Sequence, residues 1–250
     1  MTSQTKQTKN EFFSSQSSDY SDAIPYDSYV DLRKISIVEE NLSKNKNVLD
    51  VGCADGLHLP RFATQCNHIT GLDYSTDMIA SSRQKLDDAG TKNYTLVEAS
   101  AEEMPLDDNQ FDLVYSYSTL VVVNDIDKAL SEIARVLKPG GTAIIDMMGS
   151  KNLSSHYWEN YYQKRCDMGI NTFPYKTLCS KMENLGLDTL SSEAIGFTDQ
   201  WKYMPIIGRA KFIHKLFHSG SGKPDLDSKI SNWSILKPYA NRWFFKVTKS

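Results

Sequence analysis

The chain lacks the features of exported, membrane-spanning and zinc-binding proteins. No apolar run approaches the roughly 20 residues that span a bilayer, and the N-terminus has no basic flank, apolar core and small-residue cleavage site. The four cysteines, Cys53, Cys66, Cys166 and Cys179, are widely spaced, and none forms a CxxC pair near a histidine. The sequence therefore predicts a cytoplasmic protein with reduced thiols, no metal site and no transmembrane segment.

Acidic residues are scarce in the last fifth of the chain. From Gln200 to Ser250, ten Lys or Arg stand against two acids, although the whole chain has a net charge of -3. That overall charge argues against a protein built to neutralise a nucleic-acid backbone. The basic stretch has two interpretations, a solvated face or a surface that meets an anionic partner.

Length and composition favour one folded domain. At 250 residues and 40% hydrophobic composition the chain can bury one substantial core. Residues 1–19 are rich in Ser, Thr, Gln and Lys and poor in aliphatic residues, so we expect a flexible leader followed by a single domain over 20–250.

Short apolar runs alternate with stretches of helical length and periodicity. The expected strands are 47–51, 68–72, 94–97, 111–115 and 142–147, with two more at 187–195 and 242–248. The expected helices are 30–42, 57–65, 76–89, 127–137, 152–168 and 175–185. Strands that alternate with helices pair in parallel through right-handed crossovers. The sequence thus predicts an α/β, Rossmann-like open sheet of seven mostly parallel strands with helices on both faces. Segments 150–172 and 199–238 are expected to form a helical cap over an acceptor site.

One loop carries the strongest functional signal. Residues 48–56, VLDVGCADG, run from an apolar strand into a small-residue loop and then a helix. In an open α/β sheet ligands bind outside the carboxyl end of such a strand. Asp73 ends the next strand about 20 residues later, where an acid can accept hydrogen bonds from a ribose diol. An ordinary strand-to-helix turn is the alternative.

Two other nucleotide-binding motifs are missing. A dinucleotide-binding fingerprint needs GxGxxG, but here Gly52 is followed by Ala54 and Gly56, and Leu59 stands near the position of the third glycine. A P-loop would require GK[ST] after the glycines, and none follows. A nucleotide-dependent oxidoreductase therefore stays a weaker alternative.

From Val48 to Ile145 the chain resembles the class I S-adenosylmethionine-dependent methyltransferases of the broad small-molecule type. That family shows a VLDVGCGxG-like motif, GxDxS, an AxxxPF-like segment before FDxV, and LKPGG before the fifth strand. Here these are VLDVGCADG, GLDYS, AEEMPL with FDLV, and LKPGG. The resemblance covers about two fifths of the chain. It implies an enzyme that binds S-adenosylmethionine and releases S-adenosylhomocysteine.

The resemblance also implies a set of cofactor-binding residues. The loop would hold the methionine part of the cofactor, and Asp73 would hold its ribose. The other residues would border the adenine or line the side nearest the sulfonium. These residues are Asp50, Gly52, Cys53, Ala54, Gly56, Asp73, Tyr74, Met78, Ala101, Glu102, Ser116 and Tyr117. Ala54 departs from the usual glycine. Tyr20 or Tyr26 could close over the cofactor or simply pack at the domain edge.

Methyl transfer to a hydroxyl would benefit from a general base. His156 is the leading candidate because it lies after the fifth expected strand, in the segment that roofs the acceptor site in this fold. A surface histidine is the alternative. Aromatic residues near His156 and in 201–218 could stack on an acceptor or form the core of a cap.

The expected function is methyl transfer to an O or N atom of a small-molecule or glycan-type acceptor. The mixture of aromatic and basic residues in 201–218 suits an anionic acceptor or shallow contact with an anionic membrane. DNA is excluded as a target because SYST replaces an NPPY-like motif after the fourth strand. The alternatives are an RNA methyltransferase and an inactive cofactor-binding partner subunit.

Overall fold

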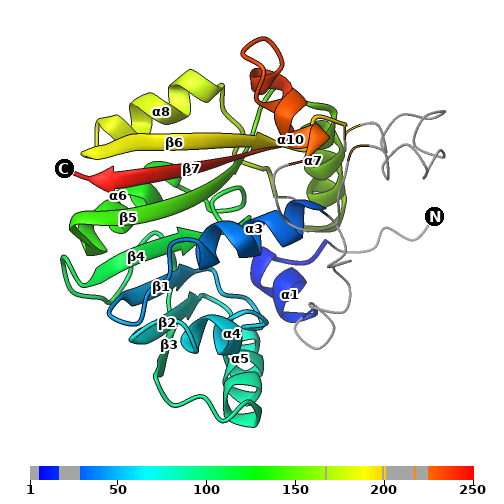
Figure 1. Ribbon diagram of the computed structural model, residues 1–250. Helices are drawn as coiled ribbons and strands as arrows, with labels where there is room; N and C mark the ends of the chain where they lie inside the picture. The colour runs from blue at the N-terminus through cyan, green and yellow to red at the C-terminus, as the bar shows by residue number, and fades with distance from the viewer. Residues whose placement is uncertain (1–5, 17–28, 167, 199, 201–216, 218–224) are drawn as a thin grey trace.

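The computed structural model describes residues 6–16, 29–166, 168–198, 200, 217 and 225–250. Seven strands form one sheet in the order β3-β2-β1-β4-β5-β7-β6 (Figure 1). The strands are β1 (Asn47–Val51), β2 (His68–Asp73), β3 (Tyr94–Glu98), β4 (Phe111–Ser116), β5 (Leu137–Met148), β6 (Leu187–Ile195) and β7 (Arg242–Lys249). The first five pair in parallel, and β7 runs antiparallel between β5 and β6. The predicted seven-stranded, mostly parallel sheet is confirmed.

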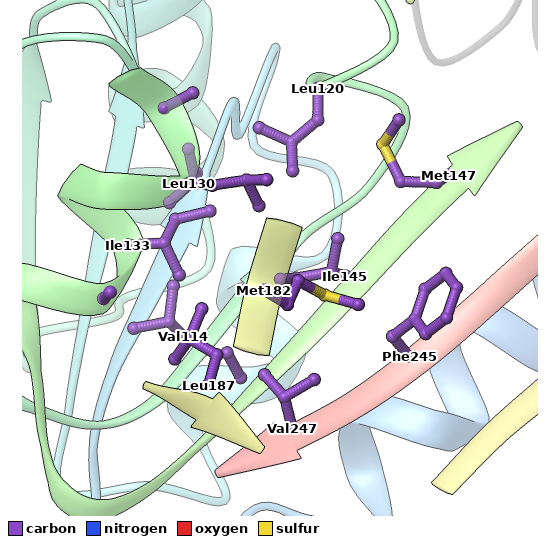
Figure 2. Close-up of a cluster of buried hydrophobic side chains, with 14 of the residues drawn as sticks. Val114, Leu120, Leu130, Ile133, Ile145, Met147, Met182, Leu187, Phe245 and Val247 are labelled. Atoms are coloured by element: carbon purple, nitrogen blue, oxygen red, sulfur yellow. The ribbon is translucent and has the colours of Figure 1, made fainter. Parts of the chain in front are cut away.

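Helices cover both faces of the sheet. The helices are α1 (Lys9–Ser14), α3 (Tyr29–Glu39), α4 (Leu59–Ala63), α5 (Thr76–Asp88), α6 (Ile126–Val136), α7 (Leu153–Cys166), α8 (Tyr175–Glu183), α10 (Leu226–Ser231) and the 3-10 helix η3 (Lys237–Tyr239). On one face, α6 and α8 bury Leu130, Ile133 and Met182 against strand residues such as Val114 (Figure 2). On the other, α3, α4 and α5 bury their apolar sides, for example Val38 and Phe62.

Local sequence signals fix where several helices begin. The side chain of Ser75 accepts a hydrogen bond from the amide of Met78 at the start of α5, and the carboxylate of Asp125 accepts from two amides at the start of α6. Such caps satisfy amides that have no partner within the helix. The last turn of α6 leads directly into β5, which begins at Leu137 rather than at the predicted Thr142 because Leu137 pairs with Phe111.

The structure differs from the expected flexible leader at residues 9–14. These residues form α1, whose start is fixed by a capping box between Thr8 and Glu11. Phe12 is buried, and its ring packs edge-on against Tyr161 and Tyr162 of α7. Tertiary contacts of one aromatic side chain therefore order a segment whose polar composition favoured disorder. Figure 1 shows α1 on the side of the sheet toward which β4 and β6 point.

Within the described part of the chain, no helix is long and apolar enough to cross a membrane.

Candidate cofactor and acceptor site

The loop after β1 has a backbone shape that only small residues allow. Gly52 has φ of 80°, and a Cβ built there would lie 1.9 Å from Oγ1 of Thr119. Its amide and that of Cys53 donate to the carbonyl of Leu72 at 2.7 and 3.0 Å, which holds the loop against the end of β2. Ala54 has φ of 48°, a region that costs a residue with a Cβ about 1 kcal/mol. The departure from glycine at this position is thus accommodated with strain.

Asp73 joins the ends of β1 and β2. One carboxylate oxygen accepts from the amide of Ala54 at 2.9 Å, and the other accepts from the amide of Ser75 at 3.0 Å. Burial raises the pKa of Asp73, while these amides and the ammonium of Lys9 oppose that rise. A carboxylate offers about four lone pairs, so Asp73 keeps acceptor capacity for a ligand.

A cavity of about 330 Å³ opens between the ends of β1, β2 and β4. Its volume lies within the roughly 300 to 1,000 Å³ of small-molecule sites. Eight of the predicted cofactor residues line it: Gly52, Ala54, Asp73, Tyr74, Met78, Ala101, Glu102 and Tyr117. The cavity is lined mainly by apolar groups, with carboxylates at Asp73 and Glu102. A nucleoside fits this distribution, with its aromatic base against the apolar groups and its ribose diol near a carboxylate.

Four predicted cofactor residues lie behind the cavity wall. Asp50, Cys53, Gly56 and Ser116 do not belong to its lining. The hydroxyl of Ser116 donates to the carbonyl of Val51 at 3.1 Å, and a Cβ at Gly56 would meet Ser82. These residues shape the loop from beneath and have no surface in the cavity.

Asp50 is a buried acid with a neutral partner. It is 8% exposed, and the hydroxyl of Tyr115 donates to it at 2.8 Å. Burial raises its pKa to about 7, the nearby charge of Asp73 acts in the same direction, and the hydrogen bond from Tyr115 opposes both. The carboxyl therefore changes its charge near neutral pH.

Sequence analysis missed the contribution of α1. Lys9 and Phe13 line the cavity. The ammonium of Lys9 donates to the carbonyl of Val122, and the hydroxyl of Tyr74 donates to the carbonyl of Lys9 at 3.3 Å. Burial lowers the pKa of Lys9, while Glu102 and Asp73 favour its charged form. The capping box at Thr8 and Glu11, followed by two phenylalanines, was the available signal.

The wall beyond Tyr117 is backed by a charged cluster. Asp146 of β5 is fully buried, and its Oδ2 accepts from Arg242 at 3.0 Å and lies 3.5 Å from Nζ of Lys34. The amide of Ser118, which lines the cavity, donates to the same oxygen at 3.2 Å. Oδ1 of Asp146 is buried and has no hydrogen-bond partner among the described residues. Sequence analysis did not identify this acid.

The structure does not bring His156 to this cavity. It is exposed on α7 and lines a second cavity of about 590 Å³ together with Leu153, Phe197 and Tyr239. No histidine of the described residues lines the first cavity. Tyr20, Tyr26 and most of the aromatic stretch 201–218 lie outside the described residues. Among the residues whose positions are described, no three His, Cys, Asp or Glu gather as metal ligands.

Known proteins match the same part of the chain. Residues 49–145 match the sequence model of the methyltransferase domain family. A malonyl-[acyl-carrier protein] O-methyltransferase of Buchnera aphidicola is 31% identical over 144 residues, 54% of this chain and 56% of that protein. A demethylmenaquinone methyltransferase of Listeria welshimeri is 36% identical over 121 residues, 47% of this chain and 51% of that protein. The chain thus spans about half the length of these relatives.

Solved structures share the fold over most of the chain. A chain from the complex between the Haloferax volcanii Trm112 methyltransferase activator and a methyltransferase has a TM-score of 0.67 at 18% identity and covers 94% of this chain and 96% of that one. Phosphoethanolamine N-methyltransferase 2 of Haemonchus contortus has a TM-score of 0.60 at 22% identity, covering 87% of this chain and 52% of that one. The [4+2]-cyclase SpnF has a TM-score of 0.62 at 19% identity, covering 88% of this chain and 80% of that one.

The motifs, the sheet order and the family match agree. Residues 49–145 carry the sequence of a methyltransferase domain, and the motifs and sheet order support the class I, S-adenosylmethionine-dependent type.

Proposed function

We propose that the protein is an enzyme that transfers a methyl group from S-adenosylmethionine to an O or N atom of a small-molecule or glycan-type acceptor. One observation carries this proposal: the cavity combines the glycine loop after β1 with the buried carboxylate of Asp73. When bound, S-adenosylmethionine supplies a methyl group already activated by its sulfonium. Two relatives carry malonyl-acyl-carrier protein and demethylmenaquinone in their names, which supports a metabolite rather than a nucleic acid as acceptor.

The lining residues suggest which groups hold the cofactor. Gly52 and Ala54 would face the methionine part, and Asp73 would accept hydrogen bonds from the ribose hydroxyls. Tyr74 and Met78 would border the adenine, with Ala101 and Glu102 at its edge, and Tyr117 would lie toward the reacting end. Asp50, Cys53, Gly56 and Ser116 support these residues from behind the wall. This division agrees with the cavity lining.

The remaining task of the protein is to orient the acceptor and exclude water. Lys9, Phe13 and Tyr162 line the cavity, and the rings of Phe13 and Tyr162 are in contact. Asp146 is buried behind the wall and holds the amide of Ser118, which lines the cavity, so it can fix the wall that faces the acceptor. His156, the expected base, lines the other cavity.

We also propose a cytoplasmic location. All four cysteines are free, which supports a reducing compartment.

Calorimetric titration tests the cofactor assignment directly. We expect S-adenosylhomocysteine to bind in the micromolar range and NADH to give no heat. A methyltransferase assay with phenols, amines, carboxylates and sugars should then yield a product heavier by one methylene. Cofactor binding without any product from the panel would favour a partner subunit or another reaction on the same fold. No binding of S-adenosylhomocysteine would refute the proposal.

Asp73→Asn tests the ribose contact. It keeps the size of the side chain but removes the charge, and we expect affinity for S-adenosylhomocysteine to fall about tenfold. Glu98→Gln is a matched control at the end of the neighbouring strand, where the carboxylate bonds to Thr76 and lines no part of the cavity. Equal affinities of the two variants would contradict the assignment.

A further inference from the structure

Exposed apolar side chains concentrate at one end of the molecule. Among the described residues, seven large hydrophobic side chains are exposed, and six of them belong to segments 153–157 and 226–239. We call these six the apolar end face: Leu153, Tyr157, Leu226, Trp233, Ile235 and Tyr239. Trp233 and Ile235 are 63% and 79% exposed, higher than any other in the group. Isolated exposed apolar residues are normal, but a cluster of six marks an interaction surface.

Hydrogen bonds hold the two segments of the face together. Oε1 of Gln200 accepts from the amide of Leu153 at 2.9 Å, and Nε2 of the same side chain donates to the carbonyl of Tyr239. Nδ2 of the Asn152 side chain donates to the carbonyl of Ala240 at 3.2 Å. Leu153 and Tyr239 line the same cavity of about 590 Å³. Figure 1 shows α7 and α10 at the same end of the sheet, where β6 ends.

Trp233 and Ile235 sit on a protruding turn. The amides of Leu236 and Lys237 donate to the carbonyl of Trp233 at 2.9 and 2.7 Å, so the chain reverses between α10 and η3. The turn presents the two most exposed side chains to solvent. An exposed turn with a tryptophan and an isoleucine is suited to insertion at the boundary between lipid headgroups and acyl chains.

Two exposed lysines accompany this face. Lys151 lies two residues before the first segment, and Lys229 lies within the second. The acid within these segments, Asp227, is fully buried and accepts from the amides of Gly196 and Thr198 at 2.7 and 2.8 Å. The exposed charged side chains beside the apolar residues are therefore both cationic.

We infer that the apolar end face docks on the surface of an anionic lipid bilayer. Trp233 and Ile235 would enter the boundary between headgroups and acyl chains, and Lys151 and Lys229 would meet lipid phosphates. Aromatic residues favour that boundary, and each basic residue near an anionic surface contributes about 1 kcal/mol. The two exposed lysines favour this occupant over a second copy of the chain, which would place like charges opposite one another.

Vesicle co-sedimentation of the full chain tests this inference. We expect the chain to bind vesicles of equal parts phosphatidylglycerol and phosphatidylcholine about tenfold more tightly than vesicles of phosphatidylcholine alone, and salt to weaken that binding. The double variant Trp233→Ser/Ile235→Ser should lower the partition coefficient about tenfold. Leu190→Ser is the matched control, because Leu190 is 57% exposed on β6 and lies outside both segments of the face; it should bind like the wild type.

Independent measurements separate docking from damage to the fold. The double variant should retain the affinity of the wild type for S-adenosylhomocysteine and its melting temperature, so these readouts stay informative whatever the acceptor is. Lys151→Ser/Lys229→Ser should reduce the preference for phosphatidylglycerol several-fold. Equal binding of the double variant and the wild type, or no preference for anionic vesicles, would overturn the inference. So would a dimer, seen by sedimentation velocity, that the double variant dissociates.

Discussion

The two halves of the sheet's carboxyl edge hold buried acids by opposite means. Above β1 and β2, Asp50 is partnered by the hydroxyl of Tyr115 and Asp73 by backbone amides. Above β4, β5 and β7, Asp146 is partnered by the cations of Lys34 and Arg242. The first half thus holds its acids without a directly paired cation, and Lys9 compensates only part of the negative charge beside the cavity, which favours a positively charged cofactor. The second half balances its charge internally and needs side chains from three distant segments to do so.

Asp146→Asn should have the largest effect on stability. The substitution leaves the largely buried cation of Arg242 without its anion and Lys34 with only Asp31 at 3.7 Å, which costs about 3 kcal/mol of unfolding free energy. Asp50→Asn is the matched variant in the other half, since it removes a buried acid that has no cationic partner. At pH 8 we expect Asp50→Asn to be as stable as the wild type or more stable. Urea unfolding measures the unfolding free energy of both variants. An equal decrease in both would contradict the proposed difference between the two halves.

This contrast explains what could be predicted from the sequence. In the first half the glycine loop and Asp73 belong to two adjacent strand ends, so motif spacing alone placed them on one cavity. Asp146 gave no such signal because its partners, Lys34 and Arg242, lie more than 90 residues away in the chain. Helix α1 was missed because six residues with one buried phenylalanine do not form a periodic pattern. The role of a residue can therefore be predicted from nearby sequence only where the site is built from backbone segments that are close together in the chain.

Gly52→Ala tests whether the loop backbone is as restrictive as the structure indicates. The new Cβ would overlap Thr119 and sit at a positive φ, so we expect affinity for S-adenosylhomocysteine to fall about a hundredfold. Gly90→Ala is the control, because Gly90 has φ of 67° with nothing within 4 Å of a Cβ. It carries the same backbone strain without the overlap. Titration calorimetry should show wild-type affinity for Gly90→Ala, and a similar loss in both variants would refute the steric explanation.

The raised pKa of Asp50 predicts a pH dependence. Its pKa rises from the ordinary 3.8 to about 7 on folding, so the folded state holds this proton more tightly than the unfolded state. The stability that Asp50 contributes is present below about pH 4 and is lost as the pH rises through 7. The unfolding free energy of the wild type relative to Asp50→Asn should fall by roughly 2 kcal/mol between pH 5 and pH 7. A constant difference across this range would show that the acid is ionised throughout.

Lys9→Met should have the smallest effect, and it tests whether α1 belongs to the cofactor half. Lys9 donates to the carbonyl of Val122 and compensates part of the charge of Asp73 and Glu102, so its loss removes one contact that closes the cavity. A single hydrogen bond of about 1 kcal/mol corresponds to roughly fivefold weaker binding of S-adenosylhomocysteine. Lys128→Met, on the exposed side of α6, should leave the affinity unchanged. If Lys9→Met also binds like the wild type, α1 covers the cavity without contributing to recognition, and the first half of the edge depends on the two strand loops alone.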